Sequence, residues 1–299
     1  MSNELSIYTN LETGFEYIII PEVFSKGEIK AYCINIKDKF NKITKEWTYE
    51  LNHEWVIRNY ISVKLILSST LMLNSLDYSI DKNIRIVEPY LIYYCLLNVS
   101  RSFLLTLPTE LWRDGNLIVS PHSRVINVLT DALIHFSKSV GNTVAELLYK
   151  AKDYRELFSY RFPSSGIDSL ATDERVTIQE CEYYSRLICE IAQLHSEILQ
   201  VCLSTNVTQK YQLDIHILND IINKKVYMNK VFDPEDSYRL GYIARKVGEP
   251  INLYWMITEG LVEDFYGAWY PKNDEVSDSM DELGLFDPDK KWYRLFSPL

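Results

Sequence analysis

The most regular stretch of the sequence is DERVTIQECEYYSRLICEIAQLHSEILQVCL, which runs from Asp173 to Leu203. Its apolar residues recur at the 3.6-residue period of an α-helix, and its first turn is acidic, as suits the positive end of a helix dipole. The pattern predicts one helix of roughly thirty residues. This helix is the firmest single element that the sequence predicts.

Helical patterns also precede and follow this stretch. Ser25 with Glu28 three residues later forms a capping-box pattern, which predicts a helix from Ser25 to about Trp47. Tyr17–Ile20 is the one candidate strand. The other expected helices cover residues 54–76, 88–107, 121–138, a short span after a break at Gly141 that ends near 159, 212–225, 234–247 and 251–269. We therefore expect an all-α protein with about 60% helix or more.

The expected organisation has four parts. Residues 1–24 form an N-terminal extended segment, and residues 25–205 form a helical core in which the spans 54–76 and 88–107 lie deepest. Residues 206–270 add further helices that pack on this core. Residues 271–299 form an acidic tail that ends in the aromatic-rich sequence KKWYRLF.

The composition favours a soluble protein of a reducing compartment. Of the 299 residues, 47% are apolar, which suffices for a large buried core. The N-terminus has no signal-peptide pattern, and the most apolar stretches fall short of the roughly 20 residues of a membrane span. The five cysteines, with no CxxC pair among them, are expected to be buried free thiols. We expect a cytoplasmic location and no membrane partner.

The net charge of −10 is concentrated near the C-terminus. Ten acidic residues and one lysine lie between Glu259 and Asp289, which leaves about −1 for the remainder of the chain. The segment is either a solvated acidic surface, a docking segment for a basic partner or a shield over a basic surface. Without an excess of basic residues, the chain lacks the electrostatic basis of strong duplex DNA binding. Contact with RNA through a local patch stays open.

The motifs of common cofactor and metal sites are absent from the sequence. It has no glycine-rich phosphate loop, no GxSxG and no HExxH, and its cysteines and histidines never approach metal-ligand spacing. We expect neither a cofactor nor a metal. His135 and His195 lie within helical repeats, where core or half-buried positions are expected.

His122 stands in a different position from the other histidines. It follows Pro121 in the first turn of an expected helix, directly after the loop 108–120. Open N–H groups at a helix start attract anions, so Ser120, His122 and Ser123 are candidates for binding a phosphate or a carboxylate. The alternative is a solvent-exposed helix cap.

Two neighbouring stretches resemble a known family. They are PYLIYYCLLNVSRSFLLTL, residues 89–107, and SPHSRVINVLTDAL, residues 120–133. Together they resemble the central part of HEPN-type helical domains, including YaaC-like proteins, in which a helix with a Tyr-Tyr pair and an Arg precedes a helix that opens with His-Ser. The matching residues are Tyr93, Tyr94, Asn98, Arg101, His122 and Ser123.

This resemblance implies a HEPN-like bundle over residues 25–205 and two classes of activity. The family's metal-independent ribonuclease toxins carry an Arg and a His on one helix, separated by four to six residues, so that the Arg stands five to seven positions before the His. Here Arg113 and His122, and likewise Arg186 and His195, are nine positions apart. The sequence therefore resembles the non-catalytic relatives, which act as dimers, as partners of nucleotidyltransferases or as subunits of bacterial conflict, toxin–antitoxin and anti-phage systems.

Two hypotheses follow for the function. The first is a binding or regulatory protein that pairs with itself or with a protein partner, with the loop 160–172 and the acidic segment 259–289 as candidate contact surfaces. Its candidate binding residues are Asn98, Ser120, Ser123, Arg155, Ser164 and Ser165. The second is a ribonuclease or other nucleic-acid-processing enzyme with an unorthodox site, whose candidate residues are Tyr94, Arg101, His122, Arg155 and Arg161. For Arg101 the alternative is a structural ion pair, because an unpaired buried charge is costly.

Overall fold

The described residues of the computed structural model, 14–171, 174–258, 260–270 and 284–296, form eleven α-helices and no strand, and 71% of them are helical. The all-α prediction is therefore confirmed. In chain order the helices are α2 Ile19–Val23, α3 Lys26–Lys45, α4 Tyr49–Asp81, α5 Glu88–Thr106, α6 His122–Phe136, α7 Lys138–Tyr160, α8 Ile178–Asn206, α9 Ile215–Lys225, α10 Pro234–Lys246, α11 Leu253–Thr258 and α12 Leu261–Gly267. Short 3₁₀ turns cover Arg85–Val87 (η1) and Gly166–Ser169 (η2).

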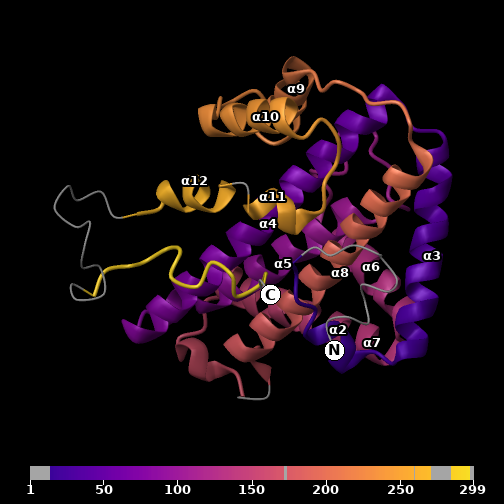
Figure 1. Ribbon diagram of the computed structural model, residues 1–299. Coiled ribbons are helices and arrows are strands. Elements are labelled where there is room, and N and C mark those ends of the chain that lie inside the picture. The colour runs from indigo at the N-terminus through magenta and orange to yellow at the C-terminus, as the bar shows by residue number, and fades with distance from the viewer. Residues whose placement is uncertain (1–13, 172–173, 259, 271–283, 297–299) are drawn as a thin grey trace.

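Three long helices, α4, α5 and α8, form the centre of the bundle (Figure 1). The most buried side chains of α5 and α8 are fully inaccessible, as Leu96 and Ile188 illustrate. α4 is 33 residues long and apolar enough, by length and composition alone, to cross a membrane, but 72% of its apolar window is buried inside the protein. The apolar surface of α4 is therefore covered by other helices, as in a core helix.

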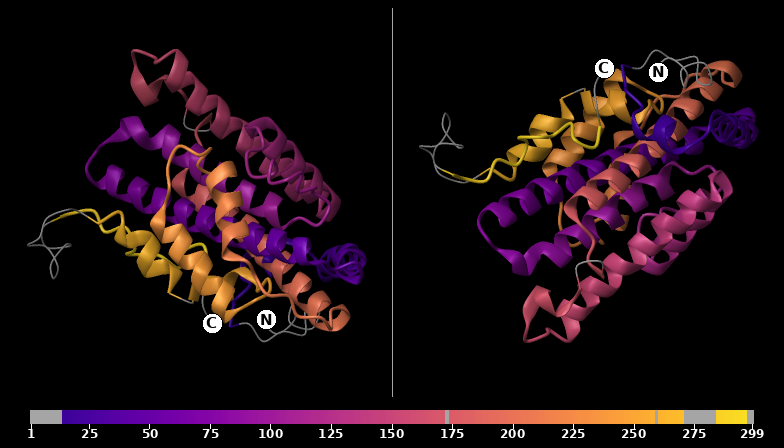
Figure 2. Two further views of the ribbon diagram at one scale, coloured as in Figure 1. Left: turned by 90° about the horizontal axis from the view of Figure 1, so that it is seen from above. Right: turned by 90° about the horizontal axis from the view of Figure 1, so that it is seen from below.

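The remaining helices cover this centre from different sides. α3 packs on α8, while α6 and α7 pack on α5 and on each other. α9 and α10 pair with each other, and α11 and α12 lie along α4 (Figure 2). One end of α7 and the segment that follows it project from the body. This arrangement brings α5, α6 and α7 together on one side of the molecule.

Capping boxes set two of the helix starts among the described residues. The side chain of Ser25 accepts the N–H of Glu28, whose carboxylate accepts the N–H of Ser25 in return, so the predicted capping box is confirmed. A second capping box, of Thr177 and Glu180, starts α8 at Ile178. The prediction that this helix begins at Asp173 was therefore wrong, although the helix is 29 residues long as expected.

The predicted strand at Tyr17–Ile20 is wrong, because the short helix α2 begins at Ile19. The buried carboxylate of Glu190, from α8, accepts the backbone N–H groups of Ile18, Ile19 and Ile20 at 2.9–3.0 Å. These are the N–H groups that the first turn of a helix leaves without partners. A side chain some 170 positions away along the chain thus caps α2, which no local pattern reveals.

Two helix limits near glycines differ from the prediction. The break after α6 falls at Ser137, which has extended backbone dihedral angles, and not at Gly141, which lies in the first turn of α7. The predicted helix 251–269 is divided into α11 and α12, and α12 starts after Gly260, whose φ of 85° is in the left-handed region that glycine adopts without strain.

Part of the predicted C-terminal tail belongs to the folded body. Leu295 and Phe296 are buried in the core, and Arg294 forms ion pairs with Asp77 of α4 and Glu182 of α8. The side-chain amide of Asn74 donates to the carbonyl of Pro288 at 2.8 Å. Residues 284–296 are therefore not a free tail; most of the acidic stretch before them, residues 271–283, lies outside the described residues.

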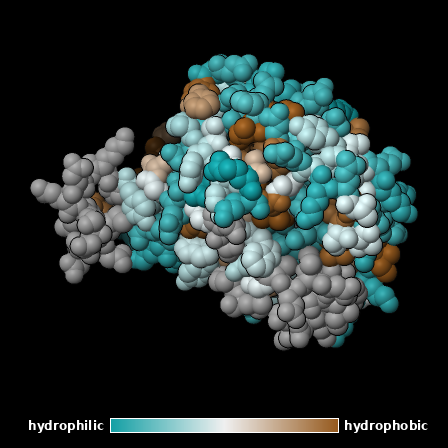
Figure 3. Space-filling view, turned by 45° about the horizontal axis from the view of Figure 1, so that its top comes forward, coloured by the Kyte–Doolittle hydropathy of each residue, from teal (hydrophilic) through white to brown (hydrophobic). Residues whose placement is uncertain are grey.

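The surface carries scattered apolar groups among hydrophilic ones (Figure 3).

All five cysteines are buried free thiols, so the predicted packing role is confirmed. His195 is fully buried, as predicted, with the hydroxyl of Tyr32 2.7 Å from its Nε2 and that of Thr106 3.2 Å from its Nδ1. His135 is exposed, so its prediction as a core or half-buried residue was wrong: its position faces away from the α6 core stripe.

Candidate functional site

Helices α5, α6 and α7 bring aromatic and basic side chains together around His122. The hydroxyl of Tyr93 on α5 lies 2.8 Å from Nδ1 of His122, the first residue of α6. The ring centre of the adjacent Tyr94 is 6.2 Å from that of His122. The guanidinium carbon of Arg155 on α7 lies 4.8 Å from the ring centre of Tyr93, within the range of a cation–π contact. We call Tyr93, Tyr94, Arg101, His122 and Arg155 the His122 cluster.

Positive charges and burial keep the imidazole of His122 neutral. Burial lowers the pKa of His122, and the charges of Arg101, Arg155 and Lys152 lower it further. No side chain among the described residues caps the start of α6 at Pro121, so the positive end of the helix dipole adds to this field. His122 is therefore uncharged at neutral pH in a strongly cationic surrounding.

Arg101 is half-buried and has no carboxylate partner in the described part of the chain. Burial lowers its pKa, which the nearby Tyr93 and Tyr94 partly offset. The buried Nε of Arg101 has no hydrogen-bond partner among the described residues, and no carboxylate there lies within 4.0 Å of its guanidinium. The structural ion pair considered for Arg101 from the sequence does not form within the described residues.

Arg155 is the second cation of the cluster and is held by phenol groups. Burial lowers the pKa of Arg155, but its interactions with the hydroxyls of Tyr93 and Tyr160 outweigh this effect, and its pKa is raised. Its buried Nε also has no hydrogen-bond partner among the described residues. Lys152, one helical turn earlier, lies 3.7 Å from the carboxylate of Glu156. Arg155 thus keeps its full charge beside an aromatic face.

The structure joins four of the residues predicted from the sequence. Tyr94, Arg101, His122 and Arg155 lie together, although they come from three helices. Tyr93 of the cluster was part of the family pattern but not of the predicted site residues. Lys152 and Tyr160, which act on His122 and Arg155 from beside the cluster, were not predicted either. Lys152 and Arg155 are three residues apart and therefore lie on one face of α7. This spacing was the sequence signal that could have identified Lys152 as a second basic residue next to Arg155.

Other predicted site residues have structural contacts of their own. The amide of Asn98 donates to the hydroxyl of Ser68 at 3.1 Å, which ties α5 to α4. The hydroxyl of Ser120 donates to the carbonyl of Leu117 and accepts from Arg124, so it stabilises the loop before α6. Ser123 is exposed in the first turn of α6.

The loop after α7 does not reach His122 through its predicted residues. Arg161, Ser164 and Ser165 are exposed. Within the described residues, no hydrogen bond, ion pair or ring contact connects these three with the His122 cluster. Only Tyr160, at the end of α7, connects this part of the chain with the cluster, through Arg155.

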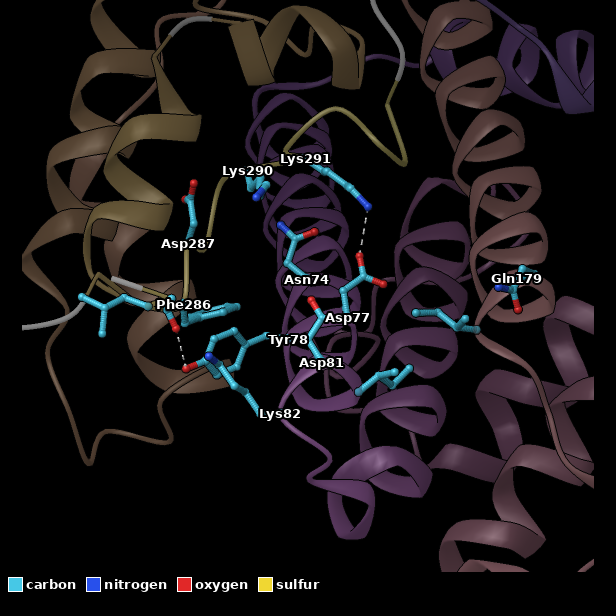
Figure 4. A pocket seen from close by; sticks show the side chains of 14 residues that line it. Asn74, Asp77, Tyr78, Asp81, Lys82, Gln179, Phe286, Asp287, Lys290 and Lys291 are labelled. Atoms are coloured by element: carbon cyan, nitrogen blue, oxygen red, sulfur yellow. Dashed lines mark hydrogen bonds and ion pairs between the residues drawn. The ribbon is translucent and has the colours of Figure 1, made fainter. Parts of the chain in front are cut away.

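A separate cavity of about 600 Å³ lies between α4, the start of α8 and residues 284–291 (Figure 4). Lys291 pairs with Asp77 at 3.2 Å, and the hydroxyl of Tyr78 donates to the carbonyl of Gly284 at 3.3 Å. Its lining mixes acidic and basic groups that partly neutralise one another, and it contains none of the predicted site residues.

Among the described residues, no group of three or more His, Cys, Asp or Glu could hold a metal ion.

Comparison with known proteins finds no matching family model, no similar curated protein and no similar solved structure.

Proposed function

We propose that the protein is a HEPN-like helical binding or regulatory protein that holds a phosphate-bearing ligand at the His122 cluster and works with a protein partner, or as a homodimer, in a bacterial conflict or anti-phage system. The observation that carries the proposal is Arg101, a half-buried guanidinium without a carboxylate partner in the described residues, beside His122. The sequence resemblance of residues 89–107 and 120–133 supplies the family and the biological setting.

The chemistry of the cluster favours an anion with several oxygens. A buried or half-buried cation without a counter-charge is costly, and an anionic ligand removes that cost. Arg101 and Arg155 offer planar forks of N–H donors, which suit phosphate better than a point charge does. The N–H groups in the first turn of α6 add donors that point in the direction favoured for phosphate at helix starts.

The experiment for this proposal is a binding titration of the full-length protein with inorganic phosphate and with a short single-stranded RNA. Arg101→Gln should weaken binding about tenfold or more, because it removes a charge-assisted contact. Arg245→Gln, which removes an exposed arginine of α10, is the matched control and should leave binding unchanged. Binding that is equally strong in the Arg101 variant would refute the proposed site.

Thermal melts separate a site from a structural role for Arg101. Because this guanidinium has no carboxylate partner in the described residues, Arg101→Gln should leave the melting temperature of the free protein unchanged or raise it slightly. A fall of several degrees would mean that Arg101 stabilises the fold through an ion pair. The proposed biological setting has its own test: a neighbouring gene for a nucleotidyltransferase, nuclease or ATPase should accompany the gene for this protein.

The second candidate function is metal-independent RNA cleavage, and the hydrogen bond between Tyr93 and His122 favours it. If Nδ1–H donates to the Tyr93 oxygen, Nε2 of the neutral imidazole can take the proton of a ribose 2′-hydroxyl. The 2′-oxygen then attacks the phosphorus, the bond to the 5′-oxygen breaks, and the leaving oxygen takes a proton from water. Arg101 and Arg155 would stabilise the negative charge that develops on phosphorus.

Cleavage assays in the presence of a chelator test this second function independently of binding. Wild-type protein should cut single-stranded RNA to products with 2′,3′-cyclic phosphate ends, and His122→Ala should lower the rate about a hundredfold or more. His135→Ala is the matched control, since His135 is an exposed histidine of the same helix. RNA that is bound but not cut by the wild-type protein would leave the binding function and reject the ribonuclease.

A further inference from the structure

The surroundings of the Tyr93 hydroxyl decide which group donates in its contact with His122. The Tyr93 side chain is only 1% exposed, and burial raises its pKa, so it is a protonated phenol at neutral pH. Nδ1 of His122, at 2.8 Å, and the guanidinium of Arg155 both lie beside its oxygen. A guanidinium has only N–H donors and cannot accept a hydrogen bond. Among the described residues, Nδ1 of His122 is therefore the acceptor for the Tyr93 O–H.

This arrangement determines which ring nitrogen of His122 carries the hydrogen. If Nδ1–H donated to Tyr93, the Tyr93 O–H would be buried without an acceptor among the described residues, which is costly. If Tyr93 donates to Nδ1, both groups are satisfied, and the single hydrogen of the neutral imidazole stands on Nε2. The hydrogen-bond network thus favours the Nε2–H tautomer, in which Nε2 of His122 is a donor.

The charges around this donor match a doubly charged anion. Arg101 and Arg155 are both partly exposed, and within the described residues no carboxylate lies within 4.0 Å of either guanidinium. Lys152 adds no net charge, since its ammonium pairs with Glu156 at 3.7 Å. With His122 neutral, two cations remain without a counter-charge. A phosphate monoester, with a charge of roughly −1.5 to −2 at pH 7, can compensate both, whereas a phosphodiester carries a single negative charge and leaves one unpaired.

We propose that the His122 cluster takes a terminal phosphate monoester as its dianion, in preference to an internal phosphodiester, with Nε2–H of His122 donating to a phosphate oxygen. The inference rests on the function proposed above and names its ligand class. Guanidinium and imidazole N–H groups are all donors, which suits phosphate oxygens that carry no hydrogen. With its hydrogen on Nε2, the ring cannot take a proton from a ribose hydroxyl through that atom. The arrangement therefore favours binding over cleavage.

Nitrogen-15 NMR of the free protein near neutral pH tests the tautomer before any ligand is added. A ring nitrogen that carries a hydrogen resonates far from one that does not, so the spectrum identifies the tautomer of each histidine. His122 should carry its hydrogen on Nε2. His53 is the internal reference for the opposite tautomer, because its Nδ1 lies 2.8 Å from the carbonyl oxygen of Tyr49 and its Nε2 accepts the N–H of Asp214. Hydrogen on Nδ1 of His122 would overturn the proposal.

Calorimetric titrations of the full-length protein with methyl phosphate and dimethyl phosphate test the ligand class. Methyl phosphate should bind about tenfold more tightly or better, because it compensates both guanidiniums. Adenosine 5′-monophosphate and O-phosphoserine carry the same group and should both bind, and the tighter of the two identifies the source of the ligand. Equal affinity for methyl and dimethyl phosphate would overturn the dianion site and leave the function proposed above intact. No binding of inorganic phosphate or of any of these compounds would reject both.

The variant Tyr93→Phe tests Tyr93 as a positioning residue. Without the hydroxyl the imidazole can turn and exchange tautomers, so methyl phosphate binding should weaken about threefold to tenfold and the His122 nitrogen signals should move. Tyr211→Phe is the matched control, since it removes a partly buried hydroxyl that donates to the carbonyl of Trp47 at 3.1 Å. It should leave both measurements unchanged. Unchanged His122 signals in the Tyr93 variant would show that Tyr93 does not set the tautomer and would overturn its positioning role.

Discussion

The hydroxyl of Tyr93 lies 2.8 Å from Nδ1 of His122, across the loop that joins α5 to α6. This contact fixes the orientation of the imidazole at the start of α6 and leaves Nε2 as the ring atom available to a ligand. The guanidinium of Arg155, from α7, lies over the ring of Tyr93. Side chains from α5, α6 and α7 therefore meet at the hydrogen bond between Tyr93 and His122. A change on any of the three helices should therefore be detectable at His122.

We predict that the pKa of His122 lies below the ordinary value of histidine and rises in the Arg101→Gln variant. Burial and the charges of Arg101, Arg155 and Lys152 all favour the neutral imidazole. The variant removes the charge of Arg101. NMR titration of the His122 ring measures the shift. The Arg245→Gln variant should titrate as the wild-type protein does; an unchanged pKa in the Arg101 variant would place Arg101 too far from His122 to act on it.

A second prediction concerns acid stability. Burial, with a smaller effect of Lys39, lowers the pKa of His195 to about 3, whereas an unfolded histidine has a pKa of about 6.5. Because the folded pKa is depressed, His195 stabilises the fold above pH 6.5 and this contribution is lost as the pH falls towards 3. Between pH 7 and pH 5 the loss is about 2 kcal/mol. Urea unfolding at several pH values measures it.

The comparison for this prediction is between two histidine variants. His195→Gln should be less stable than the wild-type protein at pH 7, but its stability should fall less steeply with acid by the same ~2 kcal/mol. His135→Gln, at an exposed position, should keep the wild-type dependence on pH. A His195 variant as acid-sensitive as the wild-type protein would show that other groups cause the loss.

We predict that Glu190→Gln loosens α2. The carboxylate of Glu190 accepts three backbone N–H groups, and an amide replaces one of its acceptor oxygens by a donor. The free energy of unfolding should fall by about 1–3 kcal/mol. Hydrogen exchange of the Ile19 and Ile20 amides should accelerate more than exchange in α3. The Glu46→Gln variant serves as the control, and equal protection of these amides in both variants would contradict the capping role.

The contrast between Ser25 and Glu190 shows what the sequence could predict. Ser25 caps a helix through a partner three residues away, so the start of α3 follows from a local pattern. Glu190 caps α2 from another helix, whereas the short apolar run Tyr17–Ile20 was predicted as a strand. Tertiary contacts thus override local propensity where the capping group is distant in sequence.

The same distinction applies to the candidate site. Tyr94, Arg101 and His122 lie on two consecutive helices, and the four- and three-residue spacings of Tyr94, Asn98 and Arg101 place them on one side of α5. Arg155 and Lys152 reach the site only because α7 packs against α5. Asn98 shows the limit of the spacing argument, since it lies on this stripe but donates to Ser68 of α4.

The last prediction concerns Gly141, through which the packing of α6 on α7 should affect the His122 cluster. A Cβ atom at Gly141 would lie 2.5 Å from the backbone nitrogen of Ile134, closer than real contacts allow. Gly141→Ala should therefore push the start of α7 away from α6 and lower the free energy of unfolding by about 1–3 kcal/mol. Because α7 carries Arg155, phosphate binding should weaken as well.

Gly27 provides the matched control for this prediction. It lies in the first turn of α3, and a Cβ there would meet nothing within 4 Å. Gly27→Ala should be neutral or stabilise the protein by up to about 1 kcal/mol, because alanine restricts the unfolded chain and favours the helix. Thermal melts and phosphate titrations of both variants give the comparison. If Gly141→Ala lowers stability but leaves phosphate binding intact, the position of α7 relative to α6 does not control the cluster, and Arg155 would lose its proposed part in binding.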